Sequence, residues 1–139
     1  MPRAAMILAA IALGACGTTG SVGSLPDDAD ATQATPANIA SLSEVIQRKP
    51  AFAEGWNKRA TALYLSGEYR RSLADCAEVI KRNPRHFGAL SGAGLNHLEL
   101  EEQRQALGWF RRALEVNPNM GAIEAEVRRL EELLRGRST

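Results

Sequence analysis

Hydrophobic residues recur along this chain with the period of an α-helix from residue 37 onward. Ahead of the first of three similar proline-ended segments, they stand at Ile39, Leu42, Val45 and Ile46. The same spacing of three, three and one residues returns at Leu73, Cys76, Val79 and Ile80, and again at Leu107, Phe110, Ala113 and Leu114. Because this spacing puts all four side chains on one face of a helix, it predicts three amphipathic helices.

Each of these three segments ends at a proline, and the prolines are evenly spaced. Pro50, Pro84 and Pro118 lie 34 residues apart. The residue before a proline is pushed out of the helical region of φ/ψ space, so each helix is predicted to stop at the same point of a repeat. An interval of this length is typical of an array of helix–turn–helix units.

Three further runs complete the helical pattern. Residues 53–67 carry Trp56, Ala60 and Leu63 on one face, and residues 87–101 carry Leu90, Ala93, Gly94 and Leu98. Residues 121–135 have the stripe Ile123, Val127, Leu130 and Leu134, with Glu124/Arg128 and Glu131/Arg135 as i, i+4 pairs on the opposite face. Such charge pairs suit the solvated cap of a stacked array. We therefore predict six helices, the first over 37–49, in an all-α domain over residues 37–135, followed by a disordered tail at 136–139.

The residues at fixed places of the interval resemble the tetratricopeptide repeat family, over about residues 37–120. The first full copy carries the family's large and small residues at Trp56, Gly67, Tyr69, Leu73, Ile80 and Pro84. The second copy carries them at Gly94, Ala106, Phe110, Ala113 and Pro118. Cys76 departs from the pattern, because it stands where the family has an aromatic residue. The resemblance implies a helix–turn–helix solenoid with two full repeats flanked by single helices.

In this family the first helices of the repeats line a concave groove that takes a peptide or a helix of a partner protein. Carried over to this sequence, the groove residues are Asn57, Lys58, Thr61, Tyr64, Leu65, Ser91, Leu95, Leu98 and Glu99. An alternative for each is that it simply packs against the flanking helices. Some family members clamp a partner's C-terminal carboxylate with a Lys and Asn set. Here Asn57 and Thr61 occupy two of those places, so recognition of a chaperone tail is not expected.

The first 36 residues have a different composition. Residues 4–15 are uncharged and follow Arg3, which fits a signal-peptide apolar region too short to span a bilayer. The run ends in Leu-Gly-Ala-Cys, which resembles the bacterial lipoprotein signal and implies a cleaved signal over 1–15 and lipidation of Cys16. A plain secretory signal with a chance cysteine is the alternative. The polar stretch that follows predicts a flexible linker, so that residues 16–36 form a lipidated cysteine and tether.

Composition and charge point away from catalysis and from nucleic acid. The chain of 139 residues has a formal net charge of +1. From residue 37 onward, 16 Lys and Arg face 13 Asp and Glu, and no aromatic platform accompanies the basic doublets, so no nucleic-acid partner is expected. Neither His86 nor His97 belongs to a metal-ligand or catalytic pattern, and Cys76 on an apolar stripe reads as a buried thiol. We predict no enzyme activity, no metal and no cofactor.

Together these features predict a membrane-anchored adaptor of the bacterial cell envelope. A lipid on Cys16 would hold the helical array at the outer membrane, facing the periplasm, where its groove would bind a protein or peptide of the envelope. Two alternatives belong to different classes. The array could stack end to end into a structural homo-oligomer, or Cys76 could act as the nucleophile of an enzyme. A soluble exported protein without lipid would keep the adaptor role.

Overall fold

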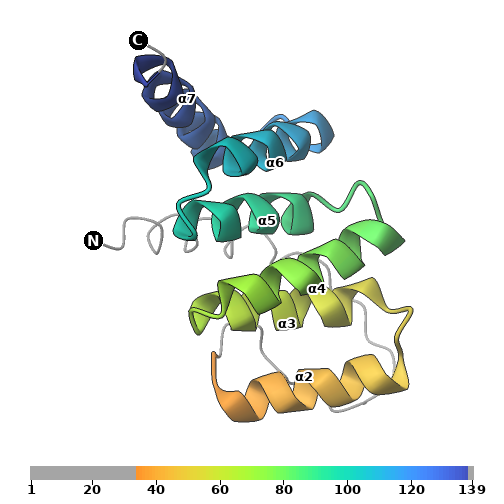
Figure 1. The fold of residues 1–139 in the computed structure, drawn as a ribbon. Coiled ribbons are helices and arrows are strands. Elements are labelled where there is room, and N and C mark those ends of the chain that lie inside the picture. The colour runs from red at the N-terminus through yellow and green to blue at the C-terminus, as the bar shows by residue number, and fades with distance from the viewer. Residues whose placement is uncertain (1–33, 138–139) are drawn as a thin grey trace.

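The computed structural model describes residues 34–137, and within this range the chain is all helical, as predicted. The predictions for Cys16 and for the linker up to residue 33 lie outside the described residues, as do residues 138 and 139. The helices are α2 (Pro36–Arg48), α3 (Ala53–Leu65), α4 (Tyr69–Arg82), α5 (Phe87–Glu99), α6 (Gln103–Val116) and α7 (Gly121–Gly136). Figure 1 shows them stacked in chain order, from α2 in orange to α7 in blue.

The prolines end the helices at the predicted place. Helices α2, α4 and α6 each stop two residues before Pro50, Pro84 or Pro118. The three intervening residues, Lys49, Asn83 and Asn117, have φ of -134°, -139° and -135°, outside the helical region. This is the restriction that a following proline imposes on the residue before it.

Helix α2 begins one residue earlier than predicted. Pro36 is its first residue, and the Thr35 side chain accepts a hydrogen bond from the Asn38 amide at 3.2 Å. A threonine cap followed by proline in the first turn is a strong helix start, because the cap satisfies a free amide and proline has none to satisfy. The helical region therefore begins at Pro36, with Thr35 as its cap.

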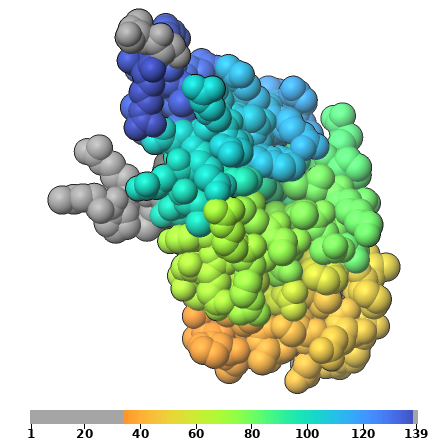
Figure 2. Space-filling view, in the orientation of Figure 1, coloured from red at the N-terminus to blue at the C-terminus, as the bar shows by residue number. Residues whose placement is uncertain are grey.

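The helices stack so that each contacts its neighbours in the chain. The α3–α4 and α5–α6 pairs are the two helix–turn–helix units, α4 also packs against α5, and α2 and α7 cover the two ends. Helices α3 and α5 touch directly as well. Figure 2 shows the resulting continuous stack from α2 to α7. The arrangement buries each apolar stripe only against the next unit, as in solenoid proteins.

The close contact between α5 and α6 depends on a glycine. A Cβ atom built on Gly94 would lie 2.5 Å from Phe110 Cδ1 and Cε1, so no side chain fits there. Phe110 is fully buried and belongs to a core cluster together with Leu95 and Ile123. The small-against-large packing expected of these two positions is therefore confirmed.

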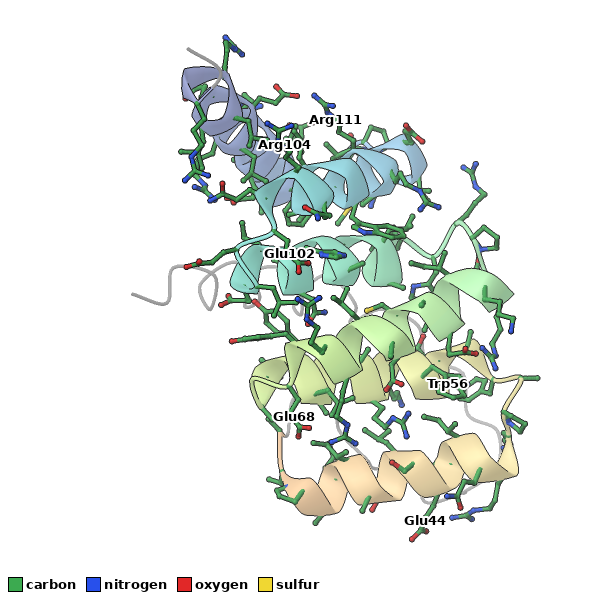
Figure 3. All side chains as sticks on the ribbon, in the orientation of Figure 1. Glu44, Trp56, Glu68, Glu102, Arg104 and Arg111 are labelled. Atoms are coloured by element: carbon green, nitrogen blue, oxygen red, sulfur yellow. The ribbon has the colours of Figure 1, made fainter. Side chains whose placement is uncertain are left out.

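The corner between α2 and α3 is fixed by hydrogen bonds to one carbonyl. Trp56 Nε1 and Arg82 Nε donate to the Pro50 carbonyl at 3.0 and 2.8 Å. The Arg82 guanidinium also lies over the Trp56 ring, 4.9 Å from its centroid. The cation–π contact and the hydrogen bond thus join the end of α4 to the turn between α2 and α3. Figure 3 labels Trp56 near the start of α3.

Helix α7 covers the end of the stack as predicted, but one of its charge pairs is different. Ile123, Val127 and Leu130 are buried against the core cluster, and Arg128 faces Glu124 at 4.0 Å. Glu131, however, accepts from Arg111 of α6 at 2.7 Å, so the predicted pairing with Arg135 is wrong. A neighbouring helix offers Glu131 a better donor than its own helix does.

Candidate interaction groove

The nine groove residues predicted from the sequence lie on two helices, α3 and α5. These are the first helices of the two repeats, and they are in direct contact. Near their C-terminal ends the Tyr64 hydroxyl donates a hydrogen bond to Glu99 Oε1 at 3.1 Å. The two residues are 35 positions apart, so this bond joins one repeat to the next.

Three of the nine predicted groove residues are buried. Tyr64, Ser91 and Leu95 are only 8, 1 and 3% exposed. Tyr64 and Leu95 belong to the core cluster with Phe110, and the Ser91 hydroxyl donates to the Gly88 carbonyl at 3.1 Å. The prediction that these three side chains are open to a ligand is therefore wrong, because they pack against neighbouring helices or the backbone of their own helix.

The other six predicted residues reach the surface. Leu65 is 40% exposed, and Asn57, Lys58, Thr61, Leu98 and Glu99 are partly exposed. Two leucines and four polar residues offer both apolar contact area and hydrogen-bonding groups, which is the composition of protein interfaces. Six of the nine predicted positions therefore remain accessible, and their role in binding stays a prediction.

A polar cluster that the sequence did not predict lies near the N-termini of α3 and α5. Glu54 of α3 accepts from Asn57 Nδ2 at 3.3 Å and lies 3.5 Å from His86 Nε2. The His86 ring also caps α5, because its Nδ1 accepts from the Ala89 amide at 3.1 Å. Hydrogen bonding from His86 lowers the pKa of Glu54 below 4.5 despite its partial burial. One indication of this contact is present in the sequence: in the family that the sequence resembles, the first helices of successive repeats lie next to each other.

A tyrosine cluster occupies the opposite end. The rings of Tyr64 and Tyr69 are 5.5 Å apart and tilted by 58°. Burial, followed by the nearby Glu99 carboxylate, raises the pKa of both tyrosines, so both hydroxyls stay protonated and able to donate. Tyr69 lies on α4 and was recognised in the sequence only as a repeat residue, not as part of the groove.

The candidates for chemistry in the described part of the chain are the Cys76 thiol and clusters of metal-ligating side chains. Cys76 is free and 2% exposed, and burial raises the pKa of its thiol to about 12, as expected for an inert buried cysteine. Among residues 34–137, His, Cys, Asp and Glu side chains form no group of three that could hold a metal ion. Within the same range, no helix is long and apolar enough to cross a membrane.

The basic doublets lie on α4, α6 and α7. Figure 3 labels Arg104 and Arg111 on α6, and both are exposed. Several of these side chains are neutralised locally: Arg70 pairs with Glu102 at 2.6 Å and Arg71 with Glu68 at 2.5 Å. This local pairing is consistent with solvated outer faces, and the absence of a nucleic-acid partner stays a prediction.

The most exposed large hydrophobic residues of the described range lie outside the terminal helices. They are Phe52, Leu65 and Phe87. Val45 of α2 and Leu133 and Leu134 of α7 are partly exposed. End-to-end self-association stays an alternative prediction.

Comparison with known proteins gives two curated relatives. The chain is 38% identical over 98 residues to a TPR repeat-containing protein of Rhizobium etli, covering 70% of this chain and 48% of that protein. It is 31% identical over 82 residues to anaphase-promoting complex subunit 3 of Schizosaccharomyces pombe, covering 59% of this chain and 12% of that protein. The chain thus spans half or less of the curated relatives it matches. No protein-family model matches it.

Solved structures share the fold. The first TPR of Spaghetti (RPAP3), bound to HSP90 peptide SRMEEVD, superposes with a TM-score of 0.68 at 21% identity, over 70% of this chain and 78% of that one. The TPR2B domain of yeast Sti1, in complex with an Hsp70 peptide, gives a TM-score of 0.63 at 25% identity, over 70% and 83%. The described helices therefore form a tetratricopeptide-type solenoid.

Proposed function

We propose, from the premise that residues 36–136 form a tetratricopeptide-type helical solenoid, that this chain is a protein-interaction adaptor. Its groove between α3 and α5 binds a segment of another protein of the bacterial cell envelope. A lipid on Cys16 holds the array at the outer membrane, facing the periplasm. In this proposal the chain is a binding module and not an enzyme.

The observation that carries the binding role is the exposed part of the groove. Leu65 stays 40% exposed, and Thr61 and Leu98 are partly exposed, although Tyr64 and Leu95 are buried. A single exposed leucine is common in a small domain, but this one ends α3, one of the two helices that line the proposed groove. Two solenoids of the same fold have been solved with peptides bound, which supports a peptide or protein as the occupant here.

The membrane part of the proposal rests on the sequence around Cys16. Restricting two partners to one membrane surface raises their effective concentration, so a small groove can suffice for binding. Metabolic labelling with a palmitate analogue tests this part. We expect labelled wild-type protein in the membrane fraction and no label in Cys16→Ala. A label that persists in Cys16→Ala, or is absent from wild type, contradicts the anchor and leaves the groove untouched.

A photo-crosslinking amino acid tests the binding role in intact cells. It is placed at Leu65 or Thr61 in the groove, and at Arg104 on the outer face as a matched control. We expect the groove positions to give one discrete protein adduct that the control position lacks. Equal adduct patterns from both faces would reject the groove as the binding surface. Positions 64 and 95 are unsuitable because both side chains are buried.

A further inference from the structure

We propose that the end of the groove at the C-termini of α3 and α5 binds a lysine or arginine side chain of the partner segment. Glu99 and the Tyr64 hydroxyl form the site, the Tyr69 ring packs against Tyr64, and Leu65 follows Tyr64 at the end of α3. This inference deepens the proposed function, because it presumes that the groove takes a protein segment and names the chemistry that the segment brings.

The first observation is that Glu99 has no cationic partner. Most carboxylates of residues 34–137 lie within 4.0 Å of an Arg or His nitrogen. The exceptions in this range are Glu99, Glu101, Glu115 and Glu132, and the last three are exposed to solvent. Glu99 alone among these four is partly buried. Partial desolvation of a carboxylate without a counter-charge is unfavourable, so a cation from outside would be stabilised there.

The second observation is that the carboxylate is already oriented. Tyr64 donates to Glu99 Oε1 at 3.1 Å, and the Tyr69 ring packs against the Tyr64 ring at 5.5 Å. A carboxylate accepts about four hydrogen bonds, so Tyr64 leaves acceptor capacity for an ammonium or a guanidinium group. Since neither tyrosine can neutralise the charge, the site is preorganised and still anionic. Preorganised groups lose little conformational entropy when a ligand binds.

The third observation is the position of the site in the fold. Leu65 is the last residue of α3 and Glu99 is the last residue of α5. A helix C-terminus carries partial negative charge, and here two of them lie at the same end of the groove. The nearest basic residue of α4, Arg70, is held by Glu102 at 2.6 Å and does not compensate Glu99. The local charge therefore favours a basic group.

Leu98 precedes Glu99 and Leu65 follows Tyr64 in the sequence, so we expect apolar side chains to contact the stem of such a side chain. Leu65 is 40% exposed, and Leu98 packs against the core cluster while reaching the surface. Lysine and arginine cover apolar surface with their methylene stems while their charged ends reach polar partners. An acidic side chain would gain the same apolar contact but would face Glu99 with like charge.

Two peptides of matched size test the inference on the full chain. They are acetyl-Gly-Ser-Leu-Lys-Leu-Ser-Gly-amide and the same peptide with Glu in place of Lys. Binding is followed by ¹H–¹⁵N NMR titration. We expect the Lys peptide to shift the amides around Leu65 and Glu99, and to bind at least about tenfold more tightly than the Glu peptide.

The variant Glu99→Gln removes the charge and keeps an acceptor for Tyr64, and Glu132→Gln on α7 changes the net charge equally. We expect Glu99→Gln to lose the preference for Lys and Glu132→Gln to keep it. Equal affinity for the two peptides, no shift at Leu65 and Glu99, or equal effects of the two variants would overturn the inference. The proposed function is judged separately by the adduct at Leu65. A discrete adduct at Leu65 together with equal affinities for the two peptides would reject the proposed Lys/Arg site at Glu99 and leave the proposed function standing.

Discussion

Arg59 of α3 and Asp75 of α4 form a two-pronged ion pair inside the first repeat. Arg59 Nε donates to Asp75 Oδ2 at 2.7 Å, and a terminal nitrogen donates to Oδ1 at 2.8 Å. The second terminal nitrogen donates to the Ser43 hydroxyl of α2 at 3.0 Å. One guanidinium thus joins three helices, and this polar contact ties α2 to the repeat that follows it.

At the equivalent positions, the second repeat has two apolar residues in place of this ion pair. Thirty-four positions after Arg59 and Asp75 stand Ala93 and Trp109, which belong to one hydrophobic cluster. Asp75→Ala should therefore cost about 3 kcal/mol of unfolding free energy, because Arg59 is left largely buried without its carboxylate. The double variant Arg59→Ala, Asp75→Trp copies the second repeat and should recover at least half of that loss.

Urea denaturation of the wild type, Arg59→Ala, Asp75→Trp and the double variant Arg59→Ala, Asp75→Trp measures this coupling as a double-mutant cycle, and Asp75→Ala is measured alongside. A double variant whose loss equals the sum of the two single losses would show that the pair does not act as a unit.

The α5–α6 contact should tolerate no side chain at Gly94. Gly94→Ala puts a methyl group within 2.5 Å of the Phe110 ring, and we expect a loss of about 1–3 kcal/mol from overpacking. Gly92→Ala on the same helix is the control, because its Cβ would meet only Cys76 Sγ at 3.4 Å. Thermal unfolding followed by circular dichroism compares them. Equal melting temperatures for the two variants would contradict the close approach.

The two turns inside the repeats should respond in opposite directions to substitution. Gly67 has φ of 81°, and Glu101, 34 residues later, has φ of 60°. Positive φ is unfavourable for residues with a Cβ, so Glu101→Gly should stabilise the protein by up to about 1 kcal/mol. Gly67→Ala should destabilise it by a similar amount. Its Cβ would meet nothing within 4 Å, which leaves the backbone as the cause. Chemical denaturation measures the free energy of unfolding of both variants. A lower value for Glu101→Gly than for the wild type would contradict a strained turn at Glu101.

The Cys76 thiol should be almost unreactive in the folded protein. Burial raises its pKa to about 12, so at pH 8 only about one part in ten thousand is thiolate. In a Cys16→Ala background, iodoacetamide should modify Cys76 only after denaturant is added, as read by mass spectrometry. Rapid labelling under native conditions would instead revive the nucleophile hypothesis.

Acid should weaken the contact between α4 and the α5–α6 turn. Hydrogen bonds from His97 at 2.5 Å and Arg70 at 2.6 Å lower the pKa of Glu102 below 4.5. Because the folded-state pKa is lowered, the stabilisation is fully present above about pH 4.5 and is lost as pH falls through the folded value. The melting temperature of the wild type should therefore drop more than that of Glu102→Gln below about pH 4.5. Parallel pH curves would show that Glu102 contributes no such dependence.

The helices could be predicted from the sequence because their signals are local. The spacing of Ile39, Leu42 and Ile46 and the prolines at fixed intervals depend only on helix geometry and on the residue before proline. The first residue of α2 was missed by one position, since Thr35 caps the helix and Pro36 fits its first turn.

The groove could be predicted only in part, because burial depends on neighbouring helices. Periodicity places Tyr64, Ser91 and Leu95 on α3 and α5, but it does not show that these side chains are buried. The burial of Tyr64 and Leu95 comes from packing in one cluster with residues of α6 and α7. The same limit explains Glu131, whose partner Arg111 comes from another helix. Contacts between residues far apart in sequence, such as Glu99 with Tyr64, carry no periodic signal.

The contact between Tyr64 and Glu99 tests the central claim most directly, because it exists only if α3 of one repeat lies beside α5 of the next. Nuclear Overhauser effects between the Tyr64 ring protons and the Glu99 side-chain protons measure that proximity in solution. We predict clear cross-peaks between them in the wild-type protein. Cross-peaks from Tyr64 to α4 without any to α5 would mean that the repeats do not stack, and the groove would then not exist.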